Sequence, residues 1–370
     1  MRISQIFAGP YDDGPRARLF EQVAGAFALP DELRQQLILA QRPGWERLAD
    51  FGRPTLALPY RRLLDRTAWI ARSRRALADE LALFKPDLIA VWGAEAAARL
   101  PARCDAATVG IAGEADDAVA LRRCRYLVAL SPEIARRAVE RGWPEERLRP
   151  LPLFAEGDLV EPLPRGALAT AEAATVVALP FALNLEALGE VLLAARRLPL
   201  PTLWIPGGSR RQSRLALRLQ VPLRELGPDV DRARALAAAD LVLCSAEADG
   251  LGLGIVEGWA RGKPVVAAGA PGASGLVRDA GNGILARSTG AADLAEALLR
   301  PLDDPLLYDR LAAEGRASFD AGHAEARSLA RWLDAYVRLG GLVLPDSPAA
   351  RETAGPSHRA AQPDHTDIQV

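Results

Sequence analysis

A stretch that starts at Leu241 constrains the fold more than any other part of the chain. It opens with Leu241–Ser245, an apolar run with the length of a buried strand. A turn rich in glycine follows, and after it we expect a short helix from about Leu253 that Gly262 closes. Val265–Ala268 is then the next expected strand. Strand, turn, helix and strand in this order make the unit of a parallel sheet, so the stretch predicts an α/β fold.

The turn itself, residues 249–254, suits an anionic ligand. Its glycines let the backbone pass close to a bound molecule, and the N-terminus of the following helix offers unpaired N–H groups and the positive end of a dipole. Asp249 lies before that helix end and Glu257 about one turn inside the helix, so both carboxylates can line the mouth of one cleft. Taken alone, however, such a turn more often connects a strand to a helix and binds nothing.

Composition excludes several functional classes. The chain has 370 residues, which predicts two domains, and its hydrophobic content of 49% is enough for sizeable cores. A net charge of −1 gives no reason to expect nucleic acid as a partner. The three cysteines are scattered, and two of the three histidines lie near the C-terminus, which excludes a disulfide framework, a histidine metal cage and a Ser-His-Asp triad. Without a signal peptide or an apolar run of membrane-spanning length, we expect a cytoplasmic protein.

The two carboxylates and the residues after them resemble a known signature. Asp249, seven residues and Glu257 are followed by the run GKPVV, residues 262–266. This order is similar to the donor-site signature of family 4 of the retaining glycosyltransferases, where two glutamates at this spacing stand in a phrase such as EGFGLxxxEAxAxGxPVV. Here Asp249 replaces the first glutamate and Trp259 occupies the common methionine position. The resemblance implies a transferase that uses a nucleotide-sugar donor.

The resemblance also implies a set of site residues. Glu257 would hold the ribose hydroxyls of the donor, and Asp249 would lie near the transferred sugar as the catalytic residue. Gly207 and Arg210 are further donor-binding candidates, because arginines after a second glycine turn can supply positive charge unless they only form an exposed helix face; these are Arg210, Arg211 and Arg214. The turn amides would lie near the diphosphate, and their residues are Gly250, Leu251, Gly252, Leu253 and Gly254.

The sequence departs from the family at the start of the second domain. Family members usually carry a GRLxxxKG-like phrase there, whose Arg and Lys hold the diphosphate, whereas Phe181 and Glu186 stand at those positions here. Losing two charge-assisted hydrogen bonds costs roughly 3–6 kcal/mol, so we expect weak donor binding. The strand that ends at Leu179 should deliver this loop to the cleft, opposite the turn at residues 252–254.

The N-terminal half resembles the same family. Residues 124–154 are similar to the end of its N-terminal domain, although Leu153 stands where members usually have Asn and no histidine lies near residues 112–113. The implied fold is the GT-B architecture, in which two Rossmann-like domains face a central cleft. The expected organisation is an acceptor-side domain in residues 1–160, a donor domain in residues 161–325, a helix in residues 326–345 that crosses back to the first domain, and a disordered tail in residues 346–370.

The leading hypothesis is a glycosyltransferase that moves a sugar from a nucleotide-sugar to a glycan, lipid-linked or lipopolysaccharide-type acceptor with retention of configuration. No metal or other cofactor is expected, because helix dipoles, amides and cationic side chains can neutralise the leaving diphosphate. One alternative is a non-catalytic, glycosyltransferase-like binding protein that lacks the diphosphate clamp. A sugar-nucleotide epimerase of the same fold is the other.

An arginine-rich helical stretch, Arg61–Phe84, bears on where the protein acts. It is interpreted either as a solvated face over an apolar core stripe or as a peripheral attachment to an anionic membrane. The second interpretation would place a cytoplasmic enzyme at the inner face of the membrane, next to a lipid-linked acceptor.

Overall fold

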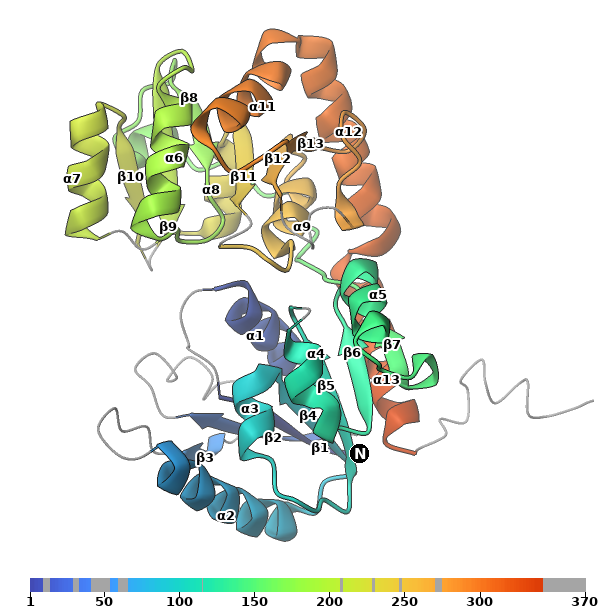
Figure 1. Ribbon diagram of the computed structural model, residues 1–370. Coiled ribbons are helices and arrows are strands. Elements are labelled where there is room, and N and C mark those ends of the chain that lie inside the picture. The colour runs from blue at the N-terminus through green and yellow to red at the C-terminus, as the bar shows by residue number, and fades with distance from the viewer. Residues whose placement is uncertain are drawn as a thin grey trace, which may run out of the picture.

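The computed structural model consists of two lobes, each built on its own sheet (Figure 1). It describes residues 1–8, 14–28, 33–40, 54–58, 66–114, 116–206, 209–227, 230–245, 248–269 and 275–341. Gly207 and the expected tail at residues 346–370 therefore lie outside the described residues, as do residues 61–65 of the arginine-rich stretch.

The N-terminal lobe holds a seven-stranded sheet in the order β3-β2-β1-β4-β5-β6-β7, in which every pair of neighbours is parallel. Its strands are β1 Arg2–Phe7, β2 Arg34–Ala40, β3 Pro54–Leu58, β4 Leu88–Trp92, β5 Ala107–Ala112, β6 Tyr126–Ala129 and β7 Leu148–Pro150. Its helices are α1 Pro15–Phe27, α2 Arg66–Phe84, α3 Gly93–Arg99, α4 Asp117–Ala120, η2 Leu121–Arg123, α5 Pro132–Glu140 and η3 Glu145–Arg147.

The C-terminal lobe holds a six-stranded parallel sheet in the order β10-β9-β8-β11-β12-β13. Its strands are β8 Thr175–Ala178, β9 Pro201–Pro206, β10 Leu223–Leu226, β11 Leu241–Ser245, β12 Val265–Ala268 and β13 Ile284–Ala286. The helices of this half are η4 Arg165–Leu168, α6 Leu185–Ala195, α7 Arg210–Leu219, α8 Arg232–Ala238, α9 Leu253–Ala260, α11 Ala291–Asp303, α12 Pro305–Gly322 and α13 Glu325–Leu339.

The strands at the centre of each sheet are apolar along their whole length because helices cover both faces. All residues of β4 and of β11 are buried. Along β8 the side chains alternate between two cores, with Val176 packed in the core that continues into the N-terminal lobe and Val177 in the core on the other face. Two parallel sheets in two lobes confirm the α/β, GT-B-type fold that the sequence predicts.

The carboxyl ends of the two sheets face one another. Gly113 follows β5, and a Cβ atom added to it would lie only 2.9 Å from the Leu251 side chain in the turn after β11. In each sheet the strand order reverses at the first strand, between β1 and β4 in one lobe and between β8 and β11 in the other. Ligands of doubly wound sheets bind at such reversals, beyond the carboxyl ends of the strands, so the region between the lobes is the candidate site.

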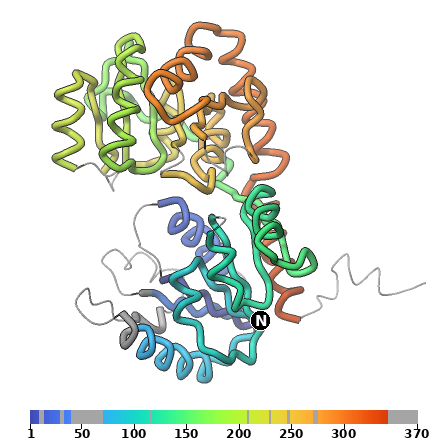
Figure 2. Tube along the Cα trace, viewed as in Figure 1, coloured from blue at the N-terminus to red at the C-terminus, as the bar shows by residue number. Residues whose placement is uncertain are grey.

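The last helix, α13, returns from the C-terminal lobe to the N-terminal one, as Figures 1 and 2 show. Its Trp332 stacks on Trp92 with 6.0 Å between ring centroids, and the indole N–H donates to the carbonyl of Pro152 at 3.0 Å. Tyr336, fully buried, packs edge-on against Phe27. The boundaries at residues 160, 325 and 345 stay a prediction. No helix in the described part of the chain is long and apolar enough to cross a membrane.

Candidate donor site between the lobes

The turn before α9 has the conformation that its glycines permit. Gly252 has φ +84°, a left-handed conformation that L side chains rarely adopt, and it is the N-cap residue of α9. A Cβ atom at Gly254 would lie 2.7 Å from the Pro180 ring, so only glycine allows the helix to approach the loop after β8. The contact places the loop that carries Phe181 opposite the turn, as the sequence predicts.

Asp249 caps α9 instead of lining an open cleft. The residue is 3% exposed, and its Oδ1 accepts hydrogen bonds from the amides of Gly252 at 3.0 Å and Leu253 at 2.9 Å, while Oδ2 accepts one from Gly254 at 2.8 Å. The expectation that Asp249 lines the cleft mouth is therefore wrong for this conformation. An aspartate is one methylene shorter than a glutamate, and its carboxylate folds back onto the turn amides that were assigned to the diphosphate.

Burial raises the pKa of Asp249 to about 7, against the amide hydrogen bonds, which favour the ionised form. Protonation removes the cost of burying a charge, although a carboxylic acid accepts hydrogen bonds from the turn amides less strongly than a carboxylate. The state of the helix cap is thus linked to pH near neutrality.

Glu257 lies at the junction of the lobes. It is 6% exposed, and its Oε2 accepts from the Nη2 of Arg232 at 2.6 Å and the Nε at 3.2 Å. The Nε of Arg18, on α1 of the other lobe, lies 3.9 Å from Oε1. Arg261, one helical turn further along the chain, donates instead to the backbone carbonyls of Glu156 and Asp158.

A small cavity of about 20 Å³ lies beside this carboxylate. Three guanidinium groups and two carboxylates surround it, which leaves a formal surplus of one positive charge. The charged residues of its wall are Arg18, Glu156, Arg232, Glu257 and Arg261.

The loop after β8 carries no cation of its own near α9. Phe181 is 2% exposed, and the Cζ atom of Arg232 lies 4.4 Å from the centroid of its ring. Glu186 is exposed in the first turn of α6. Arg210 is exposed at the start of α7, like Arg211 and Arg214, so the helix-face interpretation fits these arginines. Gln212 joins the start of α7 to this loop, because its side-chain amide donates to the Leu183 carbonyl at 2.8 Å.

Trp259 occupies the position where the family commonly has methionine. The side chain is 1% exposed, and its indole N–H donates to the Asn282 carbonyl at 2.8 Å. Gly315 on α12 makes the room, since a Cβ atom there would lie 2.5 Å from the indole ring. The indole of Trp259 therefore packs between α9 and α12 and does not line the cavity beside Glu257.

Asp117 is the buried carboxylate of the facing lobe, and sequence analysis missed it. Its Oδ2 accepts from the amides of Gly113 and Glu114, both at 3.1 Å, and from the Nη2 of Arg16 at 2.8 Å. Its Oδ1 accepts from the amide of Ala94 at 3.2 Å. One side chain therefore joins the start of α3, the loop after β5 and the start of α1, at the carboxyl edge that faces the turn before α9.

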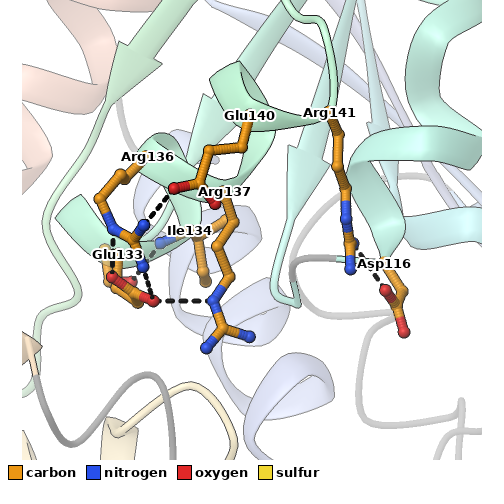
Figure 3. A network of polar contacts seen from close by, with 8 residues as sticks. Asp116, Glu133, Ile134, Arg136, Arg137, Glu140 and Arg141 are labelled. Atoms are coloured by element: carbon orange, nitrogen blue, oxygen red, sulfur yellow. Dashed lines mark hydrogen bonds and ion pairs between the residues drawn. The ribbon is translucent and has the colours of Figure 1, made fainter.

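A polar network on α5 lies at the same junction (Figure 3). Glu133 accepts hydrogen bonds from Arg136 and Arg137, which lower its pKa to about 2. The Cβ of Glu133 lies 4.0 Å from the position that a Cβ on Gly275 of the C-terminal lobe would take. Arg141, further along, pairs with Asp116 at 2.6 Å. The start of α5, where Glu133 is paired with arginines, therefore lies next to the C-terminal lobe.

The residues of this junction that sequence reasoning missed are Arg16, Arg18, Asp117 and Arg232. Arg232 follows Asp231, which caps α8 through the amide of Arg234 at 3.1 Å. Asp231 is a typical N-cap residue and could have indicated the start of α8. Nothing in the local pattern pointed from Arg232 to a carboxylate 25 residues further on.

Comparisons with known proteins agree with the geometry. The family described as "Glycosyl transferases group 1" matches residues 180–304, which include the turn, Glu257 and the loop with Phe181. Two lipopolysaccharide core biosynthesis glycosyltransferases of Rhizobium meliloti (strain 1021) align over nearly their whole length. LpsE is 28% identical over 92% of this chain and 98% of its own, and LpsD is 25% identical over 91% and 98%.

A solved structure shares the fold. Anabaena Alr3699/HepE, crystallised with UDP and glucose, superposes with a TM-score of 0.71 at 18% identity, over 90% of this chain and 99% of its own. In the described part of the chain, no group of three or more His, Cys, Asp or Glu side chains is placed to hold a metal ion. Signature and fold agree with these comparisons: residues 180–304 match the group 1 glycosyltransferases, and the chain is a glycosyltransferase with the GT-B fold.

Proposed function

We propose that this enzyme transfers a sugar from a nucleotide-sugar to a lipopolysaccharide-core or related lipid-linked glycan, with retention of configuration. The acceptor class is suggested by LpsE and LpsD, whose names place them in lipopolysaccharide core biosynthesis. A uridine nucleotide is the first donor to test, because HepE was crystallised with UDP.

The observation that carries the proposal is the position of Glu257. A buried carboxylate at the junction of the lobes is costly unless cations and hydrogen-bond donors hold it, and here two arginines from opposite lobes do so. Ribose hydroxyls can replace those donors when a nucleotide binds. Such an exchange keeps the carboxylate satisfied in both states.

The conformation seen here is closed around Glu257. Its cavity of about 20 Å³ has room for roughly one water molecule, whereas ligands of drug size or larger occupy several hundred Å³. Donor entry therefore requires the lobes to separate, which breaks the contact between Arg18 and Glu257. Closure after binding would exclude water from the sugar that is transferred.

Isothermal titration calorimetry with UDP, GDP and ADP tests the proposal. We expect one of the three to bind, and Glu257→Ala to weaken it by about tenfold or more through the lost ribose contacts. Glu296→Ala is the matched control, because Glu296 is an exposed carboxylate that also pairs with an arginine, in α11. Unchanged affinity in Glu257→Ala would exclude the ribose role, and no binding of any nucleotide to the parent would favour the non-catalytic alternative.

The face of α2 suggests where the enzyme works. Arg72, Arg74 and Arg75 are exposed there, and Leu83 is 80% exposed at the end of the helix. We infer that this face attaches a cytoplasmic enzyme to an anionic membrane surface. Sedimentation with phosphatidylglycerol-containing vesicles should remove the protein from solution, and Arg72→Glu with Arg75→Glu should abolish this, whereas Arg218→Glu in the other lobe should not. Equal sedimentation of all variants would refute the attachment.

A further inference from the structure

We propose that Arg232 provides the cationic contact for the donor diphosphate, in place of a cation on the loop after β8. The inference rests on the proposed function, since it concerns the same donor. It assigns a substrate-binding role to a residue on α8, a helix outside the glycine turn and outside the signature that follows it.

The need for a cation follows from charge. A nucleoside diphosphate carries at least two negative charges, and the departing diphosphate must be stabilised when the glycosidic bond breaks. The amides of Gly252, Leu253 and Gly254 are already engaged by the carboxylate of Asp249. Phe181, in the loop opposite them, offers an apolar ring. Neutral or negative groups thus occupy both sides of the turn, and a phosphate there needs a side-chain cation from a third element.

The position of Arg232 meets that need. Its guanidinium lies between the Phe181 ring, 4.4 Å from the centroid, and the Glu257 carboxylate, at 2.6 Å. Glu257 is one helical turn past Gly254, so the guanidinium bridges the expected ribose contact and the expected phosphate position. The bonds to Glu257 use two of the five N–H groups of the guanidinium. Its side chain is 21% exposed, and among the described residues the other three N–H groups have no hydrogen-bond partner, so they can contact a ligand.

Phe181 and Arg18 explain how Arg232 can serve both partners. A guanidinium stacked on an aromatic ring keeps its plane fixed while its edge stays free for hydrogen bonds. Arg18 lies 3.9 Å from the second oxygen of Glu257, so the carboxylate keeps a cation nearby if Arg232 shifts toward a phosphate. The surplus positive charge around the cavity, three arginines against two glutamates, is what an anionic ligand requires.

The test compares phosphate-dependent with phosphate-independent binding. Calorimetry would use whichever of UDP, GDP and ADP binds the parent, and the matching nucleoside. We expect Arg232→Gln to weaken diphosphate binding by about tenfold or more and nucleoside binding by less than about threefold. Arg234→Gln is the matched control, because Arg234 lies on the same helix, is half-buried like Arg232 and donates to the Glu161 carbonyl. It should leave both affinities unchanged.

A second variant tests the replacement directly. Phe181→Arg in the Arg232→Gln background should restore diphosphate binding, since an arginine from the loop then reaches the same place. Arg232→Lys keeps the charge and should retain part of the preference for diphosphate over nucleoside, which carries the test if the glutamine variant does not fold.

The outcomes separate this inference from the proposed function. Equal losses of nucleoside and diphosphate affinity in Arg232→Gln would mean that Arg232 only orients Glu257, and would overturn the inference. Unchanged diphosphate affinity would overturn it as well, while the donor site at Glu257 would stand. A parent that binds no nucleotide would overturn both.

Discussion

Two buried aspartates organise the two edges that face each other across the cleft, and they do so differently. Asp249 in the C-terminal lobe holds amides only three to five residues ahead of it. Asp117 in the N-terminal lobe holds one amide 23 residues away and a guanidinium 101 residues away. The first aspartate shapes one turn, whereas the second joins three segments of the lobe. Two aspartates that are both buried can therefore differ widely in how far along the chain their hydrogen-bond partners lie.

The largest expected effect comes from removing the carboxylate of Asp117, which has the more distant partners. Asp117→Ala leaves three amides and the Arg16 guanidinium without their shared acceptor, so we expect the free energy of unfolding to fall by about 3–5 kcal/mol. Chemical denaturation measures it. Asp116→Ala is the matched control, because Asp116 is its sequence neighbour but is 87% exposed and pairs only at the surface with Arg141. Similar losses in both variants would remove the distinction between the two aspartates.

A smaller effect concerns the local cap and its dependence on pH. The pKa of Asp249 rises from 3.8 to about 7 on folding, so the folded state binds the proton more tightly. Stability from this group is therefore greatest below pH 4 and is lost as the pH rises toward 7. Between pH 5 and pH 6 the parent should lose about 1.4 kcal/mol more than Asp249→Asn does.

Denaturation at the two pH values measures this difference. Asp304→Asn is the control, since Asp304 caps α12 through the amides of Leu306 and Leu307. This variant removes a capping carboxylate from another helix and leaves the turn before α9 untouched. If the parent and Asp249→Asn have the same slope, the amides hold Asp249 ionised and the local aspartate does not titrate near neutrality.

The smallest expected effect concerns Glu114, and it tests whether this residue helps Asp117 to hold Arg16. Glu114 lies 3.5 Å from the same Arg16 nitrogen that Asp117 binds, but its side chain is 68% exposed. Exposed ion pairs contribute little, so Glu114→Ala should change the free energy of unfolding by less than about 0.5 kcal/mol. A loss above about 2 kcal/mol would show that Arg16 depends on both carboxylates.

Local sequence patterns predicted most of the fold and the position of part of the candidate site. The apolar run at Leu241–Ser245, the glycines and the closing Gly262 predicted β11 and α9, because hydrogen bonds within a helix and the conformation of a turn depend on near neighbours. Glu257 was correctly placed on α9, one turn past Gly254. The partners of Glu257 were not predictable, because Arg18 and Arg232 reach it from separate helices.

The sequence by itself determined the two parallel α/β lobes, the turn before α9 and the family signature that runs from Asp249 to Val266. These depend on the order of apolar runs and glycines along a short stretch of chain. Only the tertiary structure decided that Asp249 turns back onto its own helix, that Arg232 lies over Phe181, and that Asp117 joins three segments. Such contacts follow from where whole elements pack. Which side chains meet at long range depends on how the helices and strands pack, and the spacing of residues along the chain does not show this.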